Sequence, residues 1–132
     1  MYNQLSSSDI FYAINNWGNG NIAAWGKTIA NSWSTAQPNF IQPSITNTWQ
    51  NIKANFFVNQ KQNTTGVGGW NDPGPLMIGW NLMSPEEEKT QFALWAVTKA
   101  PLMITADVLS MNNVTLLTLQ NQFLIDINQD TL

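Results

Sequence analysis

The sequence contains neither cysteine nor histidine. This excludes disulfides, thiol nucleophiles, imidazole general bases and essentially all of the usual zinc and copper sites. Arginine is also absent, so no guanidinium is present to bind bases or phosphates in a bidentate manner. Together with a net charge of −3, this argues against nucleic-acid binding. Acid–base chemistry would have to come from eight carboxylates, five lysines and two tyrosines.

Long apolar runs are missing as well. None approaches the ~20 residues that cross a bilayer, so no membrane-spanning segment is expected. Residues 1–4 contain no basic segment that leads into an apolar one, and no signal peptide is visible. What is present is a chain of 132 residues, 43% of them hydrophobic, which is enough for one domain with a core. N-glycosylation patterns at residues 63–65 and 113–115 give weak support for secretion.

The order of apolar patterns predicts alternating strands and helices. Short β-favouring runs predict strands over residues 10–14, 31–35, 67–70 and 102–105, the first of them buried, and residues 123–127 are expected to be extended. Apolar spacing and helix caps predict four helices. They cover residues 22–29, Pro43 through Phe56, Ser84 up to the stop at Pro101, and Asn112 or Asn113 through Leu119. No hairpin signal occurs, so the predicted class is α/β with parallel strands. The periodicity fits both half of a (β/α)8 barrel and a complete four-stranded α/β layer.

Three consecutive acids open the third predicted helix. Ser84 is a suitable N-cap, Pro85 follows it, and Glu87 stands at the position that closes a capping box. Glu86 and Glu88 lie in the same first turn, where negative charge suits the helix dipole. We therefore assign these acids to capping and dipole roles and not to catalysis.

The most distinctive segment spans residues 68–79, in which glycines and prolines surround Trp70, Asn71 and Asp72. Glycine permits positive φ, proline fixes φ, and an Asn-Asp-Pro run favours a rigid turn. The segment resembles the Trp-Asn-Asp-Pro-Asp-Met motif of the α-galactosidase group, glycoside hydrolase family 27. Gly74 stands where that motif has its second acid, and Pro75 stands where it has Met.

Other segments resemble motifs of the same family in the same order. They are residues 10–18, 24–33, 48–52, 92–102 and 128–130. On these motifs the chain is identified as a member of the family. The resemblance implies the C-terminal half of a (β/α)8 barrel, strands five to eight, with residues 1–132 forming a partial catalytic domain and no second domain.

The resemblance also implies a reaction and its partners. Family members hydrolyse terminal α-galactosides with retention, using two carboxylates about 5 Å apart, and no cofactor is expected. The nucleophile of the family lies on the fourth strand, which precedes the first residue of this sequence. The expected partners are an α-galactoside and either the missing N-terminal half-barrel or a second copy through self-association. The family is usually secreted, lysosomal or vacuolar.

The position of the family's acid/base residue is occupied by Pro38, which offers neither a proton nor a charge. Ser34 stands where a substrate-contacting arginine is expected, and no carboxylate lies between Asp9 and Asp72 to compensate. We therefore predict that the chain alone is inactive. The alternative is a non-catalytic sugar-binding protein descended from the family.

Four residues remain as candidates for contact with a sugar: Asn16, Trp17, Trp70 and Asp72. Asn16 stands where relatives use a residue that binds a sugar hydroxyl. For Asp72 we favour a structural role in its Asp-Pro turn, and for Trp70 we favour a place in the core over a stacking platform. Asp107 follows the last predicted strand, where a place at the active-site edge and a capping role are equally compatible with the sequence.

Overall fold

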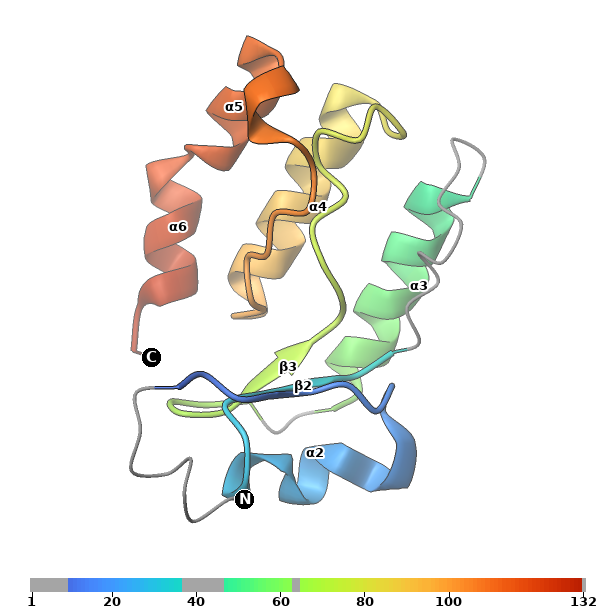
Figure 1. Cartoon of the computed structure of the whole chain (residues 1–132), viewed down its shortest axis with the longest axis vertical. Helices are drawn as coiled ribbons and strands as arrows, with labels where there is room; N and C mark the ends of the chain where they lie inside the picture. Colours follow the sequence, from blue (N-terminus) through green and yellow to red (C-terminus); the bar gives the residue numbers. More distant parts are fainter. Residues whose placement is uncertain (1–9, 37–46, 63–64, 132) are drawn as a thin grey trace.

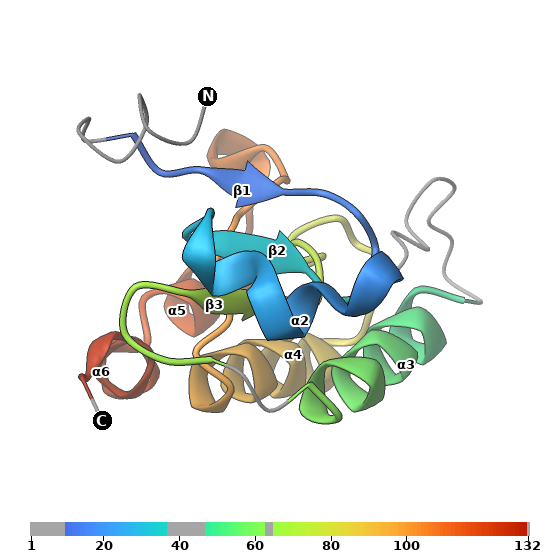
Figure 2. The same cartoon turned by 90° about the horizontal axis from the view of Figure 1, so that it is seen from below.

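A computed structural model describes residues 10–36, 47–62 and 65–131. Three short strands, β1 (Ala13–Ile14), β2 (Ser32–Ser34) and β3 (Trp70–Asp72), form a parallel sheet in the order β1-β2-β3 (Figures 1 and 2). Ala13, Ser32 and Trp70 share one row of the register, and the next residue of each strand continues it. This confirms the predicted α/β class with parallel strands.

Parallel neighbours need crossover connections, and helices supply them here. The helices are α2 (Ile22–Trp25), α3 (Thr48–Gln60), α4 (Pro85–Val97), α5 (Asn113–Leu119) and α6 (Gln122–Gln129), with 3₁₀ turns η1 (Asn19–Asn21), η2 (Gly26–Thr28) and η3 (Val108–Ser110). In Figure 1, α2 lies below the sheet, whereas α4 and α6 stand side by side above it. None of these helices, within the part of the chain that is described, could span a membrane.

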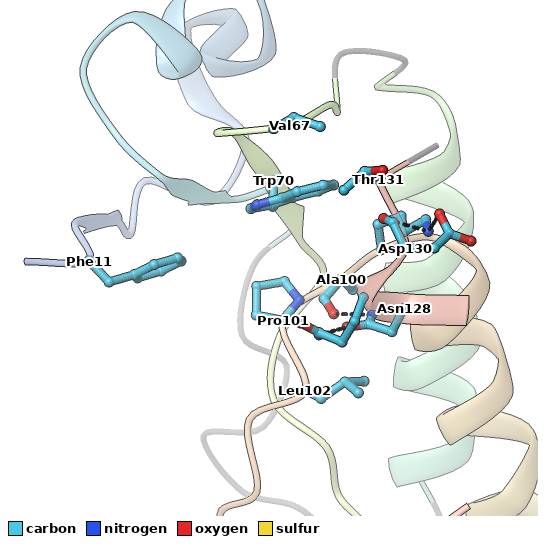
Figure 3. Close-up of a pocket in the computed structure, with 11 residues that line it drawn as sticks. Phe11, Val67, Trp70, Ala100, Pro101, Leu102, Asn128, Asp130 and Thr131 are labelled. Carbon is cyan, nitrogen blue, oxygen red and sulfur yellow. Dashed lines mark hydrogen bonds and ion pairs between the residues drawn. The ribbon is translucent and has the colours of Figure 1, made fainter. Parts of the chain in front are cut away.

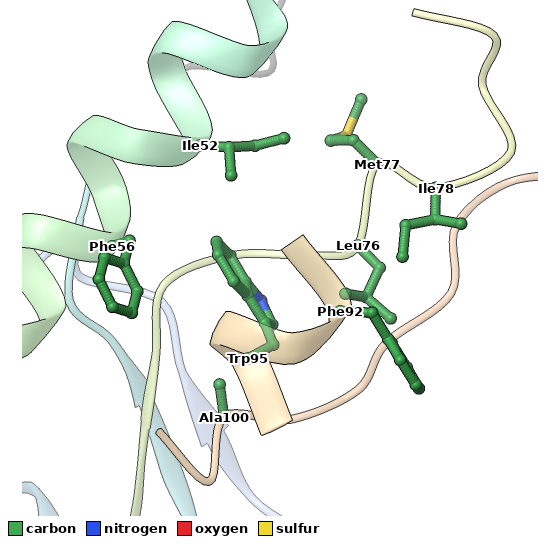
Figure 4. Close-up of a cluster of buried hydrophobic side chains, with 8 residues drawn as sticks. All are labelled: Ile52, Phe56, Leu76, Met77, Ile78, Phe92, Trp95 and Ala100. Atoms are coloured by element: carbon green, nitrogen blue, oxygen red, sulfur yellow. The ribbon is translucent and has the colours of Figure 1, made fainter. Parts of the chain in front are cut away.

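The main core lies where α3 and α4 meet the segment that follows β3. Figure 4 shows its buried side chains, which come from Ile52, Phe56, Leu76, Met77, Ile78, Phe92, Trp95 and Ala100. A second buried site surrounds Trp33 of β2, whose indole N–H donates to Asn71 Oδ1 at 2.7 Å. A Cβ on Gly26 would lie 2.8 Å from the Trp33 ring, so glycine allows η2 to pack directly on the indole.

The strands differ from the predicted ones at the edges of the sheet. Residues 10–14 are not buried, because β1 is an edge strand and Ile10 and Phe11 are exposed. The third strand begins at Trp70 because Gly66 and Gly69 close a turn with two backbone hydrogen bonds. In the predicted fourth strand, a single parallel bridge joins Ile104 to Leu76.

Two helices also differ from prediction. The extended conformation predicted for residues 123–127 is wrong: Asn121 caps α6 through a bond from Leu124 N–H, and Leu124 and Ile125 pack against the core. Their helical spacing, not their β propensity, decides the conformation. The helix that we expected Pro43 to open begins at Thr48 in the structure, and Pro43 lies outside the described residues.

The end of α4 is tied to the end of α6. Helix α4 ends at Val97, before the predicted stop, and Lys99 adopts a left-handed conformation with φ of 56°. The Lys99 ammonium donates to the Ile127 carbonyl and forms an ion pair with Asp130. The Asn128 side chain donates to the Ala100 carbonyl at 3.0 Å. These bonds fix the start of the segment that leads to Ile104.

The capping box at the start of α4 is present as predicted, with Ser84 and Glu87 bonding each other's backbone N–H. Glu88 differs from its two neighbours because it is buried. Its carboxylate accepts hydrogen bonds from Gly79 N–H at 2.8 Å and from the Thr115 hydroxyl at 3.0 Å. Glu88 therefore joins α4 to the segment after β3 and to α5, which a dipole role alone does not explain.

Candidate functional site

The residues that follow the three strands meet at one edge of the sheet. Because the strands are parallel, their carboxyl ends lie together, and this is where open α/β sheets and barrels hold ligands. Asn16 and Trp17 follow β1, Ser34 ends β2, and Asp72 ends β3. The structure thus brings Asn16, Trp17 and Asp72 to a common edge, which we call the C-terminal edge.

Ser34 organises the loop after β1. Its hydroxyl oxygen accepts hydrogen bonds from Asn16 N–H at 3.0 Å and Trp17 N–H at 2.8 Å, and its carbonyl accepts from Gly18 N–H at 2.9 Å. Trp17 has φ of 60°, an uncommon conformation for a bulky residue, and its side chain is exposed. The loop is therefore held in a strained backbone conformation that presents an indole to solvent.

Asn16 carries an unused acceptor at this edge. Its side-chain amide donates to the Asn19 carbonyl at 2.8 Å, but its Oδ1 is buried and finds no hydrogen-bond partner in the described part of the chain. A buried carbonyl without a partner costs about 1–3 kcal/mol. A ligand hydroxyl or N–H that reached Asn16 Oδ1 would remove this cost.

The carboxylates that follow strand positions hold their own turns. Asp72 Oδ1 accepts a hydrogen bond from Gly74 N–H at 2.8 Å, and Asp107 Oδ1 accepts one from Leu109 N–H at 3.0 Å. Burial raises the pKa of Asp72, and the bond from Gly74 lowers it by less. Asp107 thus caps η3, one of the two roles left open by the sequence. Pro38, the predicted acid/base position, lies outside the described residues.

The described residues contain no group of three or more acids that could hold a metal ion. With no histidine or cysteine in the sequence, the polar groups that the described residues bring to the C-terminal edge are amides, hydroxyls, the Trp17 indole N–H and the Asp72 carboxylate.

Trp70 lies apart from the other three candidates. It is the first residue of β3, whereas Asp72 is the last. Figure 3 shows the Trp70 ring over a hollow of about 260 Å³ that Phe11, Pro101 and Thr131 also line. Phe11 precedes β1 and Pro101 precedes the Ile104 bridge, so this hollow lies at the N-terminal end of the sheet.

The sequence model of the family described as Alpha galactosidase A matches residues 13–130. The chain belongs to the α-galactosidase family. It is 44% identical to Alpha-galactosidase 3 of Arabidopsis thaliana over 93% of its own length, and 38% identical to an α-galactosidase of Cyamopsis tetragonoloba over 96%.

Solved α-galactosidases also share the fold. The α-galactosidase of Saccharomyces cerevisiae, solved with raffinose, is 27% identical and superposes with a TM-score of 0.75 over 97% of this chain. The chain spans 27% and 30% of the lengths of the two plant relatives and 32% of the yeast chain. It thus corresponds to about a third of an α-galactosidase.

The α-galactosidase motifs occupy the C-terminal edge in an altered form. The Trp-Asn-Asp-Pro motif forms β3 and its turn, in which Gly74 has φ of 113°, a conformation that favours glycine. Ser34 stands at the expected arginine position, and its hydroxyl accepts hydrogen bonds from the backbone of Asn16 and Trp17. It brings no positive charge to the C-terminal edge. The sequence identified Ser34 only as a replaced arginine, because a serine that bonds a distant loop leaves no local pattern.

Sequence reasoning missed a second aromatic residue near the same edge. Trp80 follows Leu76 of the parallel bridge, is exposed, and donates its indole N–H to the Thr105 hydroxyl at 3.1 Å. The sequence pointed to Trp80 only through its position just after the glycine-rich turn, because it belongs to no periodic apolar pattern.

Proposed function

We propose that residues 1–132 form the second half, strands five to eight, of an α-galactosidase (β/α)8 catalytic barrel, as a single partial domain. Three parallel strands and the parallel bridge at Ile104 give four strand positions in sequence order, joined by helical crossovers. A (β/α)8 barrel takes about 250 residues, so four units fit the length of this chain. The complete protein would act on terminal α-galactosides.

We also propose that this chain alone hydrolyses no α-galactoside. The observation that carries this proposal is that Asp72 and Asp107, the carboxylates that follow strand positions, each bind a backbone N–H of their own turn. Retaining hydrolysis needs a nucleophile and an acid about 5 Å apart across the glycosidic bond. Pro38 cannot act as an acid, and neither influence on the pKa of Asp72 is a neighbouring charge.

An aryl α-galactoside tests this proposal directly. The purified chain of 132 residues should release no phenol above the buffer rate, while a complete α-galactosidase assayed alongside confirms the substrate. Turnover by the chain that Asp72→Asn or Asp107→Asn abolishes would show that a carboxylate of this edge is catalytic and would overturn the proposal. Turnover that survives both substitutions would indicate a contaminating enzyme, and the chain would then be purified further and assayed again.

A second candidate function is sugar binding without hydrolysis, and the buried, unpaired Asn16 Oδ1 favours it. Trp17, the next residue in the chain, has an exposed side chain, and an aromatic residue together with a hydrogen-bond acceptor suits a sugar ring. Trp70, at the other end of β3, would take no part in the same subsite.

Galactose titration separates the two functions. Binding at Asn16 and Trp17 would change tryptophan fluorescence in a saturable way, and Asn16→Ala and Trp17→Leu would each remove the change. Trp70→Phe serves as the matched control, because it removes one indole from the opposite end of the sheet. If galactose causes no saturable change, the sugar-binding function is excluded.

A further inference from the structure

Asn19 and Gly20 form an Asn-Gly pair, and no other asparagine in the 132 residues is followed by glycine. In such a pair the main-chain nitrogen of the glycine can attack the side-chain carbon Cγ of the asparagine. The attack is easier than before any other residue, because glycine has no Cβ to keep the two groups apart. A folded chain permits it where the asparagine side chain and the glycine N–H are both free and the backbone has room to turn.

The loop after β1 meets these conditions. Asn19 is exposed, and its side-chain amide makes no hydrogen bond in the described part of the chain. Gly20 N–H makes none there either, although the N–H groups of Gly18 and Asn19 are both bonded to main-chain carbonyls. Apart from chain neighbours, no atom lies within 4 Å of the position that a Cβ on Gly20 would take. Both reacting groups are thus unengaged and in open space.

Asn31 provides the contrast within the same sheet. It is followed by Ser32, which has the smallest side chain after any asparagine other than Asn19. Asn31 Oδ1 accepts a hydrogen bond from Tyr12 N–H at 2.8 Å, and Ser32 N–H donates to the Tyr12 carbonyl at 3.3 Å. Ser32 is also buried. The attacking nitrogen and the side chain that it would attack are both held, so the fold protects Asn31 and leaves Asn19 reactive.

We propose that Asn19 is a site of spontaneous deamidation, with water as the only co-reactant. The Gly20 nitrogen forms a bond to Asn19 Cγ and gives up its proton, the Cγ–Nδ2 bond breaks, and ammonia leaves a cyclic imide. Water then opens the imide at one of its two carbonyls. Opening at the former main-chain carbonyl leaves the Gly20 nitrogen on Cγ and gives isoaspartate, whereas opening at Cγ gives aspartate. Either product carries a carboxylate where asparagine had none.

Isoaspartate would change the bonds of this loop. The Asn19 carbonyl accepts from the Asn16 side-chain amide at 2.8 Å. The Gly20 carbonyl accepts from the Trp25 indole N–H at 2.9 Å. In isoaspartate the first carbonyl becomes a free carboxylate, and the main chain before Gly20 is one carbon longer, which displaces the second. Any effect on sugar contact by Asn16 rests on the second function proposed above, whereas the modification itself does not.

Mass spectrometry of the intact chain tests the proposal. The folded chain is incubated in a mildly alkaline buffer beside a synthetic peptide of residues 15–25, which gives the rate without the fold. Asn19 of the chain should gain the mass difference between an amide and an acid at no less than about a tenth of the peptide rate, and a tenfold slowing would equal about 1.4 kcal/mol of added barrier. Peptide mapping with an isoaspartate methyltransferase locates the site and identifies the product.

Two substitutions and a control assign the reaction to this pair. Asn19→Gln should abolish the fast mass gain with circular dichroism unchanged, because glutamine would have to close a larger ring. Gly20→Ala should slow it, because a Cβ hinders the approach of the nitrogen to Cγ. Asn113→Gln is the matched control: Asn113 is also exposed, but Val114 follows it, so this variant should gain mass at the rate of the unchanged chain.

Two results would overturn the proposal. If Asn19 reacts more than about tenfold more slowly in the folded chain than in the peptide, the fold protects the pair despite its free groups. If the folded chain reacts at Asn31 as fast as at Asn19, the hydrogen bonds of the sheet do not decide which asparagine reacts. Either result is distinct from a failure of the proposed function, which is measured by galactoside turnover and not by the mass of the chain.

Discussion

Replacing Glu88 by alanine is expected to destabilise the protein far more than replacing Glu86, although the two acids lie in the same helical turn. Glu88 is buried and accepts hydrogen bonds from Gly79 N–H and the Thr115 hydroxyl. Glu86 is 80% exposed and pairs with Lys89 on the surface. Both substitutions remove one negative charge near the start of α4, so the dipole effect is shared and the buried contacts make the difference.

The magnitude follows from the two hydrogen bonds. A bond to a charged group contributes about 1.5–3 kcal/mol, and Glu88→Ala removes two while leaving their donors without a partner. Because Gly79 is only partly buried, the lower end applies to its bond, and a total loss of about 3–4 kcal/mol is expected. Glu86→Ala should cost under about 0.5 kcal/mol, as exposed pairs do. Glu88→Gln keeps the shape and one acceptor, and should fall between them.

Urea unfolding, followed by circular dichroism, gives the free energies if the three variants keep a common m-value. A loss of 3–4 kcal/mol is a large fraction of the about 5–15 kcal/mol that stabilises a typical domain. If Glu88→Ala and Glu86→Ala shifted the midpoint equally, the buried Glu88 contacts would not stabilise the fold, and the account of α4 given above would be wrong.

Three further predictions concern Asp72, two glycines and the cap of α6. Burial raises the pKa of Asp72 above its ordinary value of 3.8, so the charged carboxylate costs stability at neutral pH but not below pH 3.8. The gain in thermal stability from Asp72→Asn should therefore grow as the pH rises above 3.8. A gain that is constant with pH would contradict this. Gly18 and Gly20 both have positive φ, but a Cβ on Gly18 would lie 2.5 Å from the Thr35 carbonyl oxygen, whereas a Cβ on Gly20 would meet open space. In urea unfolding, Gly20→Ala should lower the free energy of unfolding by about 1 kcal/mol, and Gly18→Ala should lower it clearly more. Equal losses would contradict the clash. Asn121→Ala should lower stability by about 1 kcal/mol and reduce the helical circular dichroism signal, since it removes the cap of α6, whereas an unchanged signal would contradict that cap.

Much of the fold could be predicted because its signals are local. The capping box at Ser84, the cap at Asn112 and the apolar spacing of Ile52 and Phe56 each lie within one turn or one face of a helix. Residues 123–127 misled the prediction because their β-favouring composition conflicts with their tertiary contacts. The Asn121 cap and the docking of Leu124 and Ile125 on the core outweigh that composition and make the segment helical.

The location of the candidate site could be predicted from the sequence, but its hydrogen bonding could not. Strand ends and the family motif led to Asn16, Trp17 and Asp72, which the structure does bring to one edge. Two features of that edge depend on contacts between distant residues: the Ser34 hydroxyl holds a loop 18 residues earlier in the chain, and Asn16 Oδ1 is left without a partner. Such long-range hydrogen bonds depend on sheet register, which a single sequence does not fix.

The ties between α4 and α6 have a consequence for the order in which the chain becomes structured during synthesis. Lys99 and Ala100 are held by Ile127, Asn128 and Asp130, which leave the ribosome 28 to 31 residues later. The sheet from β1 to β3 can pair as soon as residue 72 has emerged, since its register needs nothing further along the chain. The edge at Ile104 must wait for α6, so this end of the sheet is completed later than the pairing of β1, β2 and β3.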